Sequence, residues 1–191
     1  MKKIISLFQR NYDGDRLVRD EITPGAEWVI SGEGIATRKW DGTCCLIRAG
    51  RLYKRYDCKR GKIPPDGFEP AQEADSTTGH WPGWLPVGNG PEDRWHREAY
   101  EAHHEVLAEG TYELCGPRIN GNPEEAEEHY LVMHGEVTYP FRPQESPPPR
   151  DFQTLKLWLS IADVEGIVWH HPDGRMVKIK TKDFGLQRRK I

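Results

Sequence analysis

The sequence predicts an α+β fold of mostly antiparallel strands flanked by helices. Two hairpin patterns support this prediction. Residues 43–48 and 51–57 are β-rich runs joined by an Ala-Gly turn, and residues 163–180 hold two more runs around a Pro-Asp-Gly turn. Helical periodicity occurs at 94–107 and again at 151–161. Strands that pair with close neighbours, with helices set apart from them, are typical of α+β proteins.

The other expected elements are shorter or less regular. Strands are expected at 4–8, 26–30, 111–116 and 130–137. Residues 61–93 are rich in Gly and Pro, and we expect an ordered loop in which the stretch GHWPGWLP at 79–86 packs through its aromatic rings. A second, Pro-rich loop is expected at 140–150. Asp93 and Asp151 are candidate N-caps of the two helices.

Length and composition indicate a cytoplasmic protein with a single domain over residues 1–191. Of the 191 residues, 36% are hydrophobic and 30% are charged, and the formal net charge is -3, which argues against generic binding to polyanions. No apolar run approaches the ~20 residues that a membrane helix needs. Residues 1–30 read as a strand and turn segment, whose apolar start is interrupted too early for a signal peptide.

The cysteines and the charges are unevenly placed. The four cysteines include no C-x-x-C pair, so we expect packed, reduced thiols and no zinc or redox motif. Basic residues cluster at 54–62 and at 178–190, while acids gather at 124–128. Such segregation can focus a positive field on one cleft, although two solvated faces would look the same in the sequence.

One stretch, Lys39-Trp40-Asp41-Gly42-Thr43, has the form of a reactive lysine followed by a turn. A lysine becomes a nucleophile when burial and neighbouring cations lower its pKa from about 10.4. Arg38 is adjacent in the sequence, and the two basic clusters supply further cations. The stretch by itself equally fits a surface turn in which Asp-Gly closes a hairpin.

The last hairpin brings a carboxylate to two lysines. If His171 pairs with Gly174, Glu165 lies opposite Lys180, and Lys178 shares their face. A carboxylate with two lysines on one sheet face suits a metal ion and a phosphate. The alternative is a surface ion-pair ladder, but the apolar runs around these residues argue against it.

Three residues elsewhere are further candidates. Glu113 lies within an apolar strand, and a buried carboxylate is costly unless it is paired or bound to a metal or a hydroxyl. Arg55 shares a strand face with Tyr53 and Asp57, so it can point into the cleft beside Lys39. His134 lies near the end of the strand at 130–137.

Together these segments resemble the motifs of the covalent nucleotidyltransferases, the superfamily of ATP-dependent DNA and RNA ligases and mRNA capping enzymes. The six matching segments, in order, are Lys39-Trp-Asp-Gly-Thr43, Tyr53-Lys-Arg-Tyr-Asp57, Tyr112-Glu-Leu-Cys-Gly116, Leu131-Val-Met-His-Gly135, Glu165-Gly-Ile-Val-Trp169 and Val177-Lys-Ile-Lys180. Within the superfamily the chain is most similar to vertebrate-type 5′-3′ RNA ligases, through segments spread along nearly the whole chain beyond residue 30. Only residues 181–191 follow the last motif, so no OB domain is expected.

The resemblance implies a nucleotidyltransferase (adenylyltransferase, ATP-grasp-like) fold and an ATP-dependent RNA ligase. Lys39 would attack the α-phosphorus of ATP and form lysyl-AMP, AMP would pass to an RNA 5′-phosphate, and a 3′-hydroxyl would then displace it. Lys178 and Lys180 would hold the α-phosphate, and Asp41 would orient Lys39. Glu165, with Glu113 as a second candidate, would bind Mg²⁺ or Mn²⁺.

The resemblance also assigns the nucleotide contacts. Glu113 would hold the ribose hydroxyls, Arg55 the ribose or a phosphate, and Lys59 the pyrophosphate or the RNA end. Thr37 and Arg38 would contact the nucleotide beside Lys39, although Arg38 stands where related RNA ligases often have Glu. His134 stands at the position that stacks on adenine, often Phe in such enzymes. The alternatives are a non-catalytic binding module of the same fold and a capping-type guanylyltransferase.

Overall fold

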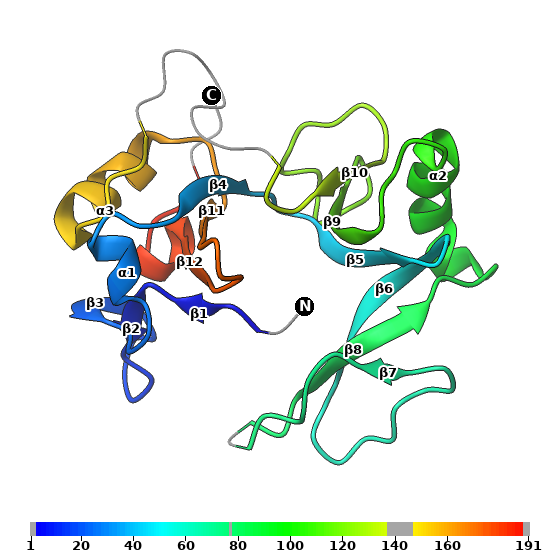
Figure 1. Ribbon diagram of the computed structural model, residues 1–191, viewed down its shortest axis with the longest axis horizontal. Helices are drawn as coiled ribbons and strands as arrows, with labels where there is room; N and C mark the ends of the chain where they lie inside the picture. Colours follow the sequence, from blue (N-terminus) through cyan, green and yellow to red (C-terminus); the bar gives the residue numbers. More distant parts are fainter. Residues whose placement is uncertain (1–2, 77, 137–146, 189–191) are drawn as a thin grey trace. The chain divides into compact units, whose positions relative to one another are not determined.

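The computed structural model describes residues 3–76, 78–136 and 147–188, and within them it is an α+β structure of mostly antiparallel strands with few helices (Figure 1). The predicted α+β class is therefore confirmed. The described residues fall into two compact units, which we call unit 1 (residues 41–134) and unit 2 (residues 3–40 and 135–188). The boundary lies between Trp40 and Asp41, inside the lysine stretch.

Unit 2 is built on a four-stranded sheet in the order β1-β12-β11-β4. Its strands are β1 (Ile5–Ser6), β4 (Ile35–Lys39), β11 (Gly166–His170) and β12 (Met176–Lys180). The three longer strands pair antiparallel, whereas β1 runs parallel to β12. The sheet therefore joins two segments from the start of the chain to two from its end.

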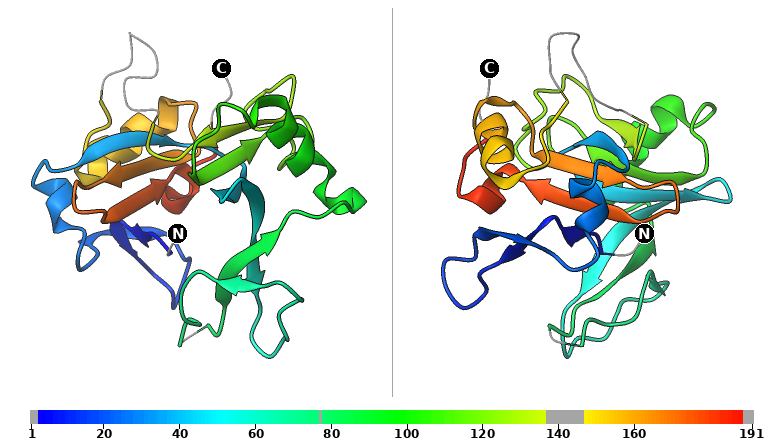
Figure 2. Two further views of the ribbon diagram at one scale, coloured as in Figure 1. Left: turned by 45° about the vertical axis from the view of Figure 1, so that its right-hand side comes forward. Right: turned by 60° about the vertical axis from the view of Figure 1, so that its left-hand side comes forward.

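One face of this sheet is the core of unit 2. Ile167 pairs with Ile179 and Trp169 pairs with Val177, and all four side chains are buried. Helix α3 (Phe152–Ile161) lies beside the sheet (Figure 2). Its buried Leu155 and Leu159 belong to the same apolar cluster. Because side chains alternate along a strand, the residues between these apolar positions face the opposite side, which is the side of the lysines.

The smaller elements of unit 2 complete that core. They are β2 (Phe8–Arg10), β3 (Val18–Ile22), α1 (Glu27–Ile30) and the 3₁₀ helix η2 (Thr181–Phe184). Asp151 caps α3 as predicted, because its carboxylate accepts the Thr154 backbone N–H at 3.0 Å. Of the Pro-rich segment predicted at 140–150, residues 140–146 lie outside the described residues.

Unit 1 is built on a six-stranded antiparallel sheet in the order β10-β9-β5-β6-β8-β7. Its strands are β5 (Thr43–Arg48), β6 (Arg51–Cys58), β7 (Glu69–Pro70), β8 (Trp81–Pro86), β9 (Gly110–Cys115) and β10 (Tyr130–Met133). The hairpin predicted from 43–48 and 51–57 is β5–β6. Cys45, Tyr112 and Leu114 face the apolar core, where Ala99 of helix α2 (Arg94–His103) is buried.

The strand expected at 4–8 is divided between β1 and β2, and the one expected at 130–137 ends at Met133. Three differences are larger, the first being at residues 26–30. These residues form α1, not a strand, and both Trp28 and Val29 are buried. A short apolar run does not distinguish a strand from one buried helical turn by its periodicity. The turn before it favours the helix, because the Glu27 carboxylate accepts the Gly25 N–H at 2.8 Å.

The second difference is β8, which includes most of the stretch 79–86 that was predicted to be a loop. Two prolines in six residues argued against a strand. Pro82 turns its carbonyl toward β7, where the Ala71 N–H donates to it at 3.0 Å, and by alternation Pro86 faces that same side. Because β7 has only two residues, the missing N–H groups of both prolines cost few ladder hydrogen bonds.

The third difference is α2, which ends at His103 instead of residue 107 and is not capped by the Asp93 side chain. The Asp93 carboxylate instead accepts hydrogen bonds from Lys54 Nζ at 2.5 Å and from the Gly88 N–H at 2.7 Å. Its burial raises the pKa of Asp93, but these hydrogen bonds and the Lys54 charge lower it overall. Asp93 therefore ties α2 to β6 by a charge pair.

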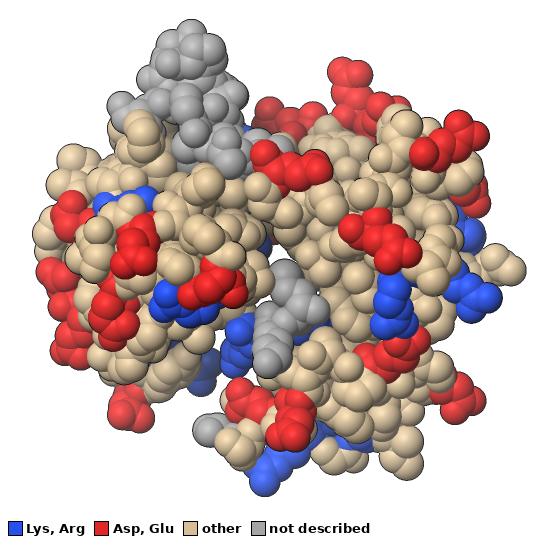
Figure 3. All heavy atoms as spheres, in the orientation of Figure 1, with Lys and Arg blue, Asp and Glu red and all other residues tan. Residues whose placement is uncertain are grey.

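No helix among the described residues is long and apolar enough to cross a membrane. The face drawn in Figure 3 carries acidic side chains with basic ones between them.

Candidate active site

Lys39, Lys178 and Lys180 lie on one face of the unit 2 sheet. Gly166 on β11 pairs with Lys39 on one side and with Lys180 on the other, and Val168 pairs with Lys178. Paired residues of antiparallel strands point to the same face. This face is opposite to the one that packs on α3, so the strand alternation that buries the core also brings the lysines together.

The predicted register of the last hairpin is wrong by one residue. His171 pairs with Arg175, its N–H donating to the Arg175 carbonyl at 2.9 Å, so Gly166 and not Glu165 lies opposite Lys180. The loop has three residues instead of two, and Gly174 takes the left-handed conformation with φ of 89°. Three-residue hairpin loops that end on a left-handed glycine are common. The predicted register is wrong because it requires a two-residue loop.

Glu165 nevertheless meets the lysines, as the sequence predicts. It directly precedes β11, and its carboxylate accepts from Lys39 Nζ at 2.5 Å through Oε2 and from Lys180 Nζ at 2.5 Å through Oε1. The side chain is 12% exposed. Its burial raises the pKa of Glu165, but the charges of Lys39 and Lys180 outweigh the burial and lower it. Glu165 is therefore an anion that bridges two ammonium groups.

Lys178 is a half-buried cation close to these two. Burial first, and then the charges of Lys180 and Lys39, lower the pKa of Lys178 from 10.5 to about 8. Asp183 and Glu165 act in the opposite direction but do not offset those effects. Burial and the neighbouring cations make the positive charge of Lys178 unfavourable. A phosphate that binds there would offset the repulsion among the lysines, so the site favours anions.

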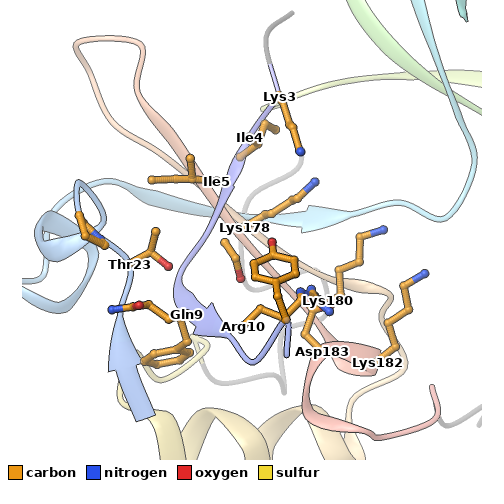
Figure 4. Close-up of a pocket in the computed structure, with 14 residues that line it drawn as sticks. Lys3, Ile4, Ile5, Gln9, Arg10, Thr23, Lys178, Lys180, Lys182 and Asp183 are labelled. Carbon is orange, nitrogen blue, oxygen red and sulfur yellow. Dashed lines mark hydrogen bonds and ion pairs between the residues drawn. The ribbon is translucent and has the colours of Figure 1, made fainter. Parts of the chain in front are cut away.

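A cavity of about 610 Å³ adjoins the lysines and is lined only by residues of unit 2 (Figure 4). The ammonium groups of Lys178, Lys180 and Lys182 extend in the same direction in this view. Lys3 and Arg10 add cations from the N-terminal segment, and Arg10 is anchored to Asp183 at 2.6 Å. The cavity is thus basic and open to an anion.

Lys3, Arg10 and Lys182 were not among the predicted site residues. Lys3 precedes β1 and Arg10 is the last residue of β2. Strand β1 reaches the lysine face through its parallel pairing with β12, in which Ser6 lies beside Lys178. Parallel pairing leaves no hairpin spacing in the sequence. The only available signal was the basic character of residues 2–10.

Thr37 and Arg38 occupy different faces of β4. Thr37 shares the face of Lys39, but it is buried, donates to the Val168 carbonyl at 3.1 Å and lies 3.1 Å from Nε2 of His170. Arg38 pairs with Ile167 on the core face, at the edge of the sheet, where its guanidinium lies 4.5 Å from the centre of the Trp40 ring. Within unit 2, the structure therefore brings together Lys39, Glu165, Lys178 and Lys180. Thr37 is a buried residue on the same sheet face.

The other predicted residues belong to unit 1, and three of them share a face of its sheet. Glu113 is buried and hydrogen-bonds through Oε2 to Nε2 of His134 at 2.9 Å, while its Oε1 accepts the Gly42 N–H at 3.2 Å. Arg55 follows the same alternation on β6, and its guanidinium lies 5.2 Å from the ring centre of Trp84. A carboxylate, an imidazole and a guanidinium on one face suit polar recognition of a ligand.

Asp41 and Lys59 lie at strand ends in unit 1. The Asp41 N–H donates to Glu124 Oε1 at 2.9 Å, and Asn120 Nδ2 donates to the Asp41 carboxylate at 3.3 Å. Asn120 also donates to the Gly42 carbonyl at 2.8 Å, so one side chain holds the turn that follows the lysine stretch. Lys59 is exposed and directly follows β6.

The lysine face of unit 2 can bind a phosphate chain and present an amine to it. Three ammonium groups and one carboxylate leave a positive balance at a half-buried site, where charges act more strongly than in water. Fold and site therefore define an α+β protein with a basic site suited to phosphoryl or nucleotidyl chemistry.

Comparison with known proteins shows which proteins the chain is similar to. A family model described as RNA ligase 1 matches residues 101–190. RNA ligase 1 of Danio rerio is 27% identical, over 80% of this chain and 67% of that protein, and RNA ligase 1 of Mus musculus and of Rattus norvegicus match with the same three figures. The resemblance inferred from the motifs is thus confirmed at this level: the chain is similar to proteins named RNA ligase 1.

Proposed function

We propose that this protein is an ATP-dependent RNA ligase that joins 5′-phosphate and 3′-hydroxyl RNA ends through a lysyl-AMP intermediate. The proposal rests on one observation above all: Lys39 ends a strand beside a carboxylate and two further lysines, within 2.5 Å of Glu165. The similarity to proteins named RNA ligase 1 supports the choice of RNA. The nucleotidyltransferase fold is part of the same proposal.

In the first step, Nζ of Lys39 attacks the α-phosphorus of ATP. The ammonium first loses a proton to water, then a nitrogen–phosphorus bond forms, the bond to pyrophosphate breaks, and the second excess proton also passes to water. Lys39 must therefore leave its ion pair with Glu165, because an ammonium held by a carboxylate is not a nucleophile. Lys178 and Lys180 bind the α-phosphate, and the cations of the adjoining cavity receive the rest of the triphosphate.

The Glu165 carboxylate and its surroundings are suited to bind a magnesium ion. Mg²⁺ commonly binds through one or two carboxylates, with substrate phosphates and water completing the shell. When bound, it would neutralise phosphate charge and replace a lysine as the partner of Glu165. Lys180 would exchange its ion pair with Glu165 for the α-phosphate.

The second and third steps use the same groups. The AMP moiety passes from Lys39 to an RNA 5′-phosphate, and a 3′-hydroxyl then attacks that activated phosphate and expels AMP. By the resemblance, we assign the ribose to Glu113, the adenine to His134, the ribose or a phosphate to Arg55, and the pyrophosphate or the RNA end to Lys59. Asp41 orients the lysine stretch, and Thr37 and Arg38 adjoin the nucleotide. Each displacement at phosphorus depends mainly on positioning and charge neutralisation.

Labelling with ATP tests the proposal. Incubated with Mg²⁺ and ATP labelled in the α-phosphate, the wild-type protein should carry label through a denaturing gel, and Lys39→Ala should carry none. Lys156→Ala is a matched control, because Lys156 is an exposed lysine on α3 of the same unit. Label retained by Lys39→Ala would exclude this nucleophile.

Two further arms separate the alternatives. Label from GTP in place of ATP would indicate a capping-type enzyme, and no label from either nucleotide would indicate a binding module. Ligation of a 5′-phosphorylated RNA, compared with the DNA of the same sequence, tests the RNA substrate directly.

A further inference from the structure

A second chemically distinct cluster lies in unit 1, on the sheet face opposite its apolar core. Cys44 on β5 pairs with Glu113 on β9, and Val132 on β10 pairs with Glu113 from the other side. His134 lies two residues after Val132, and its N–H donates to the Thr111 carbonyl at 3.0 Å, which continues the pairing. By strand alternation, a thiol, a carboxylate and an imidazole therefore share one face.

The donor atoms of these three side chains are close enough to share an ion. One ligand atom each of Cys44, Glu113 and His134 lies within 4.8 Å of the others. In a tetrahedral site with metal–ligand bonds of about 2.0–2.3 Å, ligand atoms lie roughly 3.3–3.8 Å apart. Small side-chain rotations are enough to bring the three atoms to that spacing.

The imidazole is already held in the orientation that a metal ligand needs. Nδ1 of His134 lies 3.0 Å from the Thr111 hydroxyl, and Nε2 lies 2.9 Å from Oε2 of Glu113. With a metal bound, an N–H on Nδ1 would donate to Thr111, and the lone pair of Nε2 would face the ion in place of the hydrogen bond to Glu113. Metal-bound histidines commonly have such a second hydrogen bond, which fixes the ring.

The arrangement fits a metal better than a thiol nucleophile. In a nucleophile–histidine–acid triad, the nucleophile and the acid contact opposite nitrogens of the ring. Here Thr111 contacts Nδ1 and Glu113 contacts Nε2. The carboxylate therefore occupies one nitrogen and a hydroxyl the other, which is not the arrangement of a triad.

We propose that, in the absence of nucleotide, Cys44, Glu113 and His134 form a Zn²⁺ site with an open fourth position. Thiolate and imidazole favour Zn²⁺ over Mg²⁺, which prefers oxygen ligands only, and three protein ligands with one open position are typical of accessible zinc centres. Cys44 and His134 are only partly buried, so an ion can enter from solvent. The absence of a C-x-x-C motif does not exclude the site, because its ligands come from β5, from β9 and from the residue that follows β10.

Cobalt substitution of the full chain tests the site without nucleotide or RNA. Added to the metal-free protein, Co²⁺ should give a thiolate-to-metal charge-transfer band at one equivalent, and Zn²⁺ should abolish the band by displacement. Cys44→Ser should lose the band, and His134→Ala should weaken binding by more than about tenfold. Cys58→Ser is the matched control, a buried thiol of the same unit on β6, and should keep it.

The outcome does not depend on whether the variants fold. X-ray absorption of the zinc-loaded wild-type protein should report one sulfur ligand per zinc, together with nitrogen and oxygen. No charge-transfer band in the wild type, a band retained in folded Cys44→Ser, or a zinc shell without sulfur would each overturn the proposal. In that case Glu113 and His134 are simply a hydrogen-bonded pair. Because no nucleotide is present, failure here leaves the proposed ligase function untouched.

Discussion

Glu165 is the residue on which the charge balance of the lysine face depends. It is the carboxylate that pairs with both Lys39 and Lys180, and it is 12% exposed. Removing one partner of such a pair leaves cations without compensation, which costs more than the pair itself gains. The residue therefore stabilises the unliganded protein and, by the same contacts, holds the Lys39 amine until a ligand arrives.

Glu165→Gln should therefore destabilise the protein in a pH-dependent way. The folded-state pKa of Glu165 is lowered, so its contribution to stability is present above its ordinary pKa of about 4.5 and is lost as pH falls through the lowered value. At pH 7 we expect a loss of more than about 1 kcal/mol, or roughly 2–4 °C in Tm. Thermal melts from pH 7 to pH 3 should show the difference shrinking below pH 4.5.

The control for this experiment is Glu105→Gln, which removes an exposed carboxylate of unit 1. Its Tm should follow that of the wild type at every pH. A Glu165→Gln difference that stays constant down to pH 3 would mean that lost packing, and not lost charge, causes the effect.

Lys178 illustrates the opposite case, a functional candidate that costs stability. The pKa of Lys178 is about 8 in the folded protein and about 10.5 when unfolded, so between these values the unfolded chain binds more protons. Stability should therefore rise with pH across this window, and below pH 8 the charged form carries the full penalty. Lys178 remains mostly charged at neutral pH and can therefore bind a phosphate.

We expect Lys178→Met to raise Tm at pH 7 by a few degrees and to remove the rise between pH 8 and pH 10. Under the proposed function, the same variant should form lysyl-AMP more than about tenfold more slowly, a loss of over ~1.4 kcal/mol at the transition state. Lys182→Met, also from the cavity but exposed, is the control for stability. A lower Tm in Lys178→Met would contradict the argument.

At the scale of single elements, β11 determines how close the lysines approach. Gly166 pairs with both Lys39 and Lys180, and a Cβ there would lie 2.1 Å from the Ile179 carbonyl oxygen and 2.8 Å from the Lys180 Cα. Both are backbone atoms of β12, which cannot move aside without parting the strands. Glycine is thus required at this position, because the backbones of β11 and β12 lie too close together for a side chain.

Gly166→Ala should therefore lower stability by roughly 1–3 kcal/mol, through separation of β11 from β12. Thermal unfolding measures the loss. Relative to the wild type, amide exchange in the variant should become faster along β12 but not in α2. Gly88→Ala is the matched control, because its nearest heavy atom, an Asp93 carboxylate oxygen, is 3.5 Å away. Equal Tm values for the two variants would show that the sheet accommodates the methyl group.

Elements with strong local patterns were predictable, and those decided by distant pairing were not. The β5–β6 hairpin and the cap of α3 follow from neighbouring residues. The Glu165–Lys180 contact was predicted despite a register error of one residue, because a long glutamate side chain at a strand end reaches across it. The cations of Lys3 and Arg10 were missed because β1 joins β12 by parallel pairing across most of the chain.

At the scale of the whole molecule, the chain order makes one unit an insertion in the other. Residues 41–134 are continuous and contain all six strands of their sheet together with α2. Unit 2 in contrast needs β1 and β4 from before this segment and β11 and β12 from after it. A continuous segment with its own sheet, helix and apolar core has what independent folding requires.

We therefore expect a fragment of residues 41–134 to fold alone. Circular dichroism should show β structure with a cooperative thermal transition, and amide exchange should protect β5, β6 and β9, which form the middle of its sheet. Residues 3–40 expressed alone serve as the comparison and should remain unfolded, because β1 and β4 pair only with strands from the end of the chain among the described residues. An unfolded 41–134 fragment would mean that its core, although continuous in sequence, depends on unit 2 for stability.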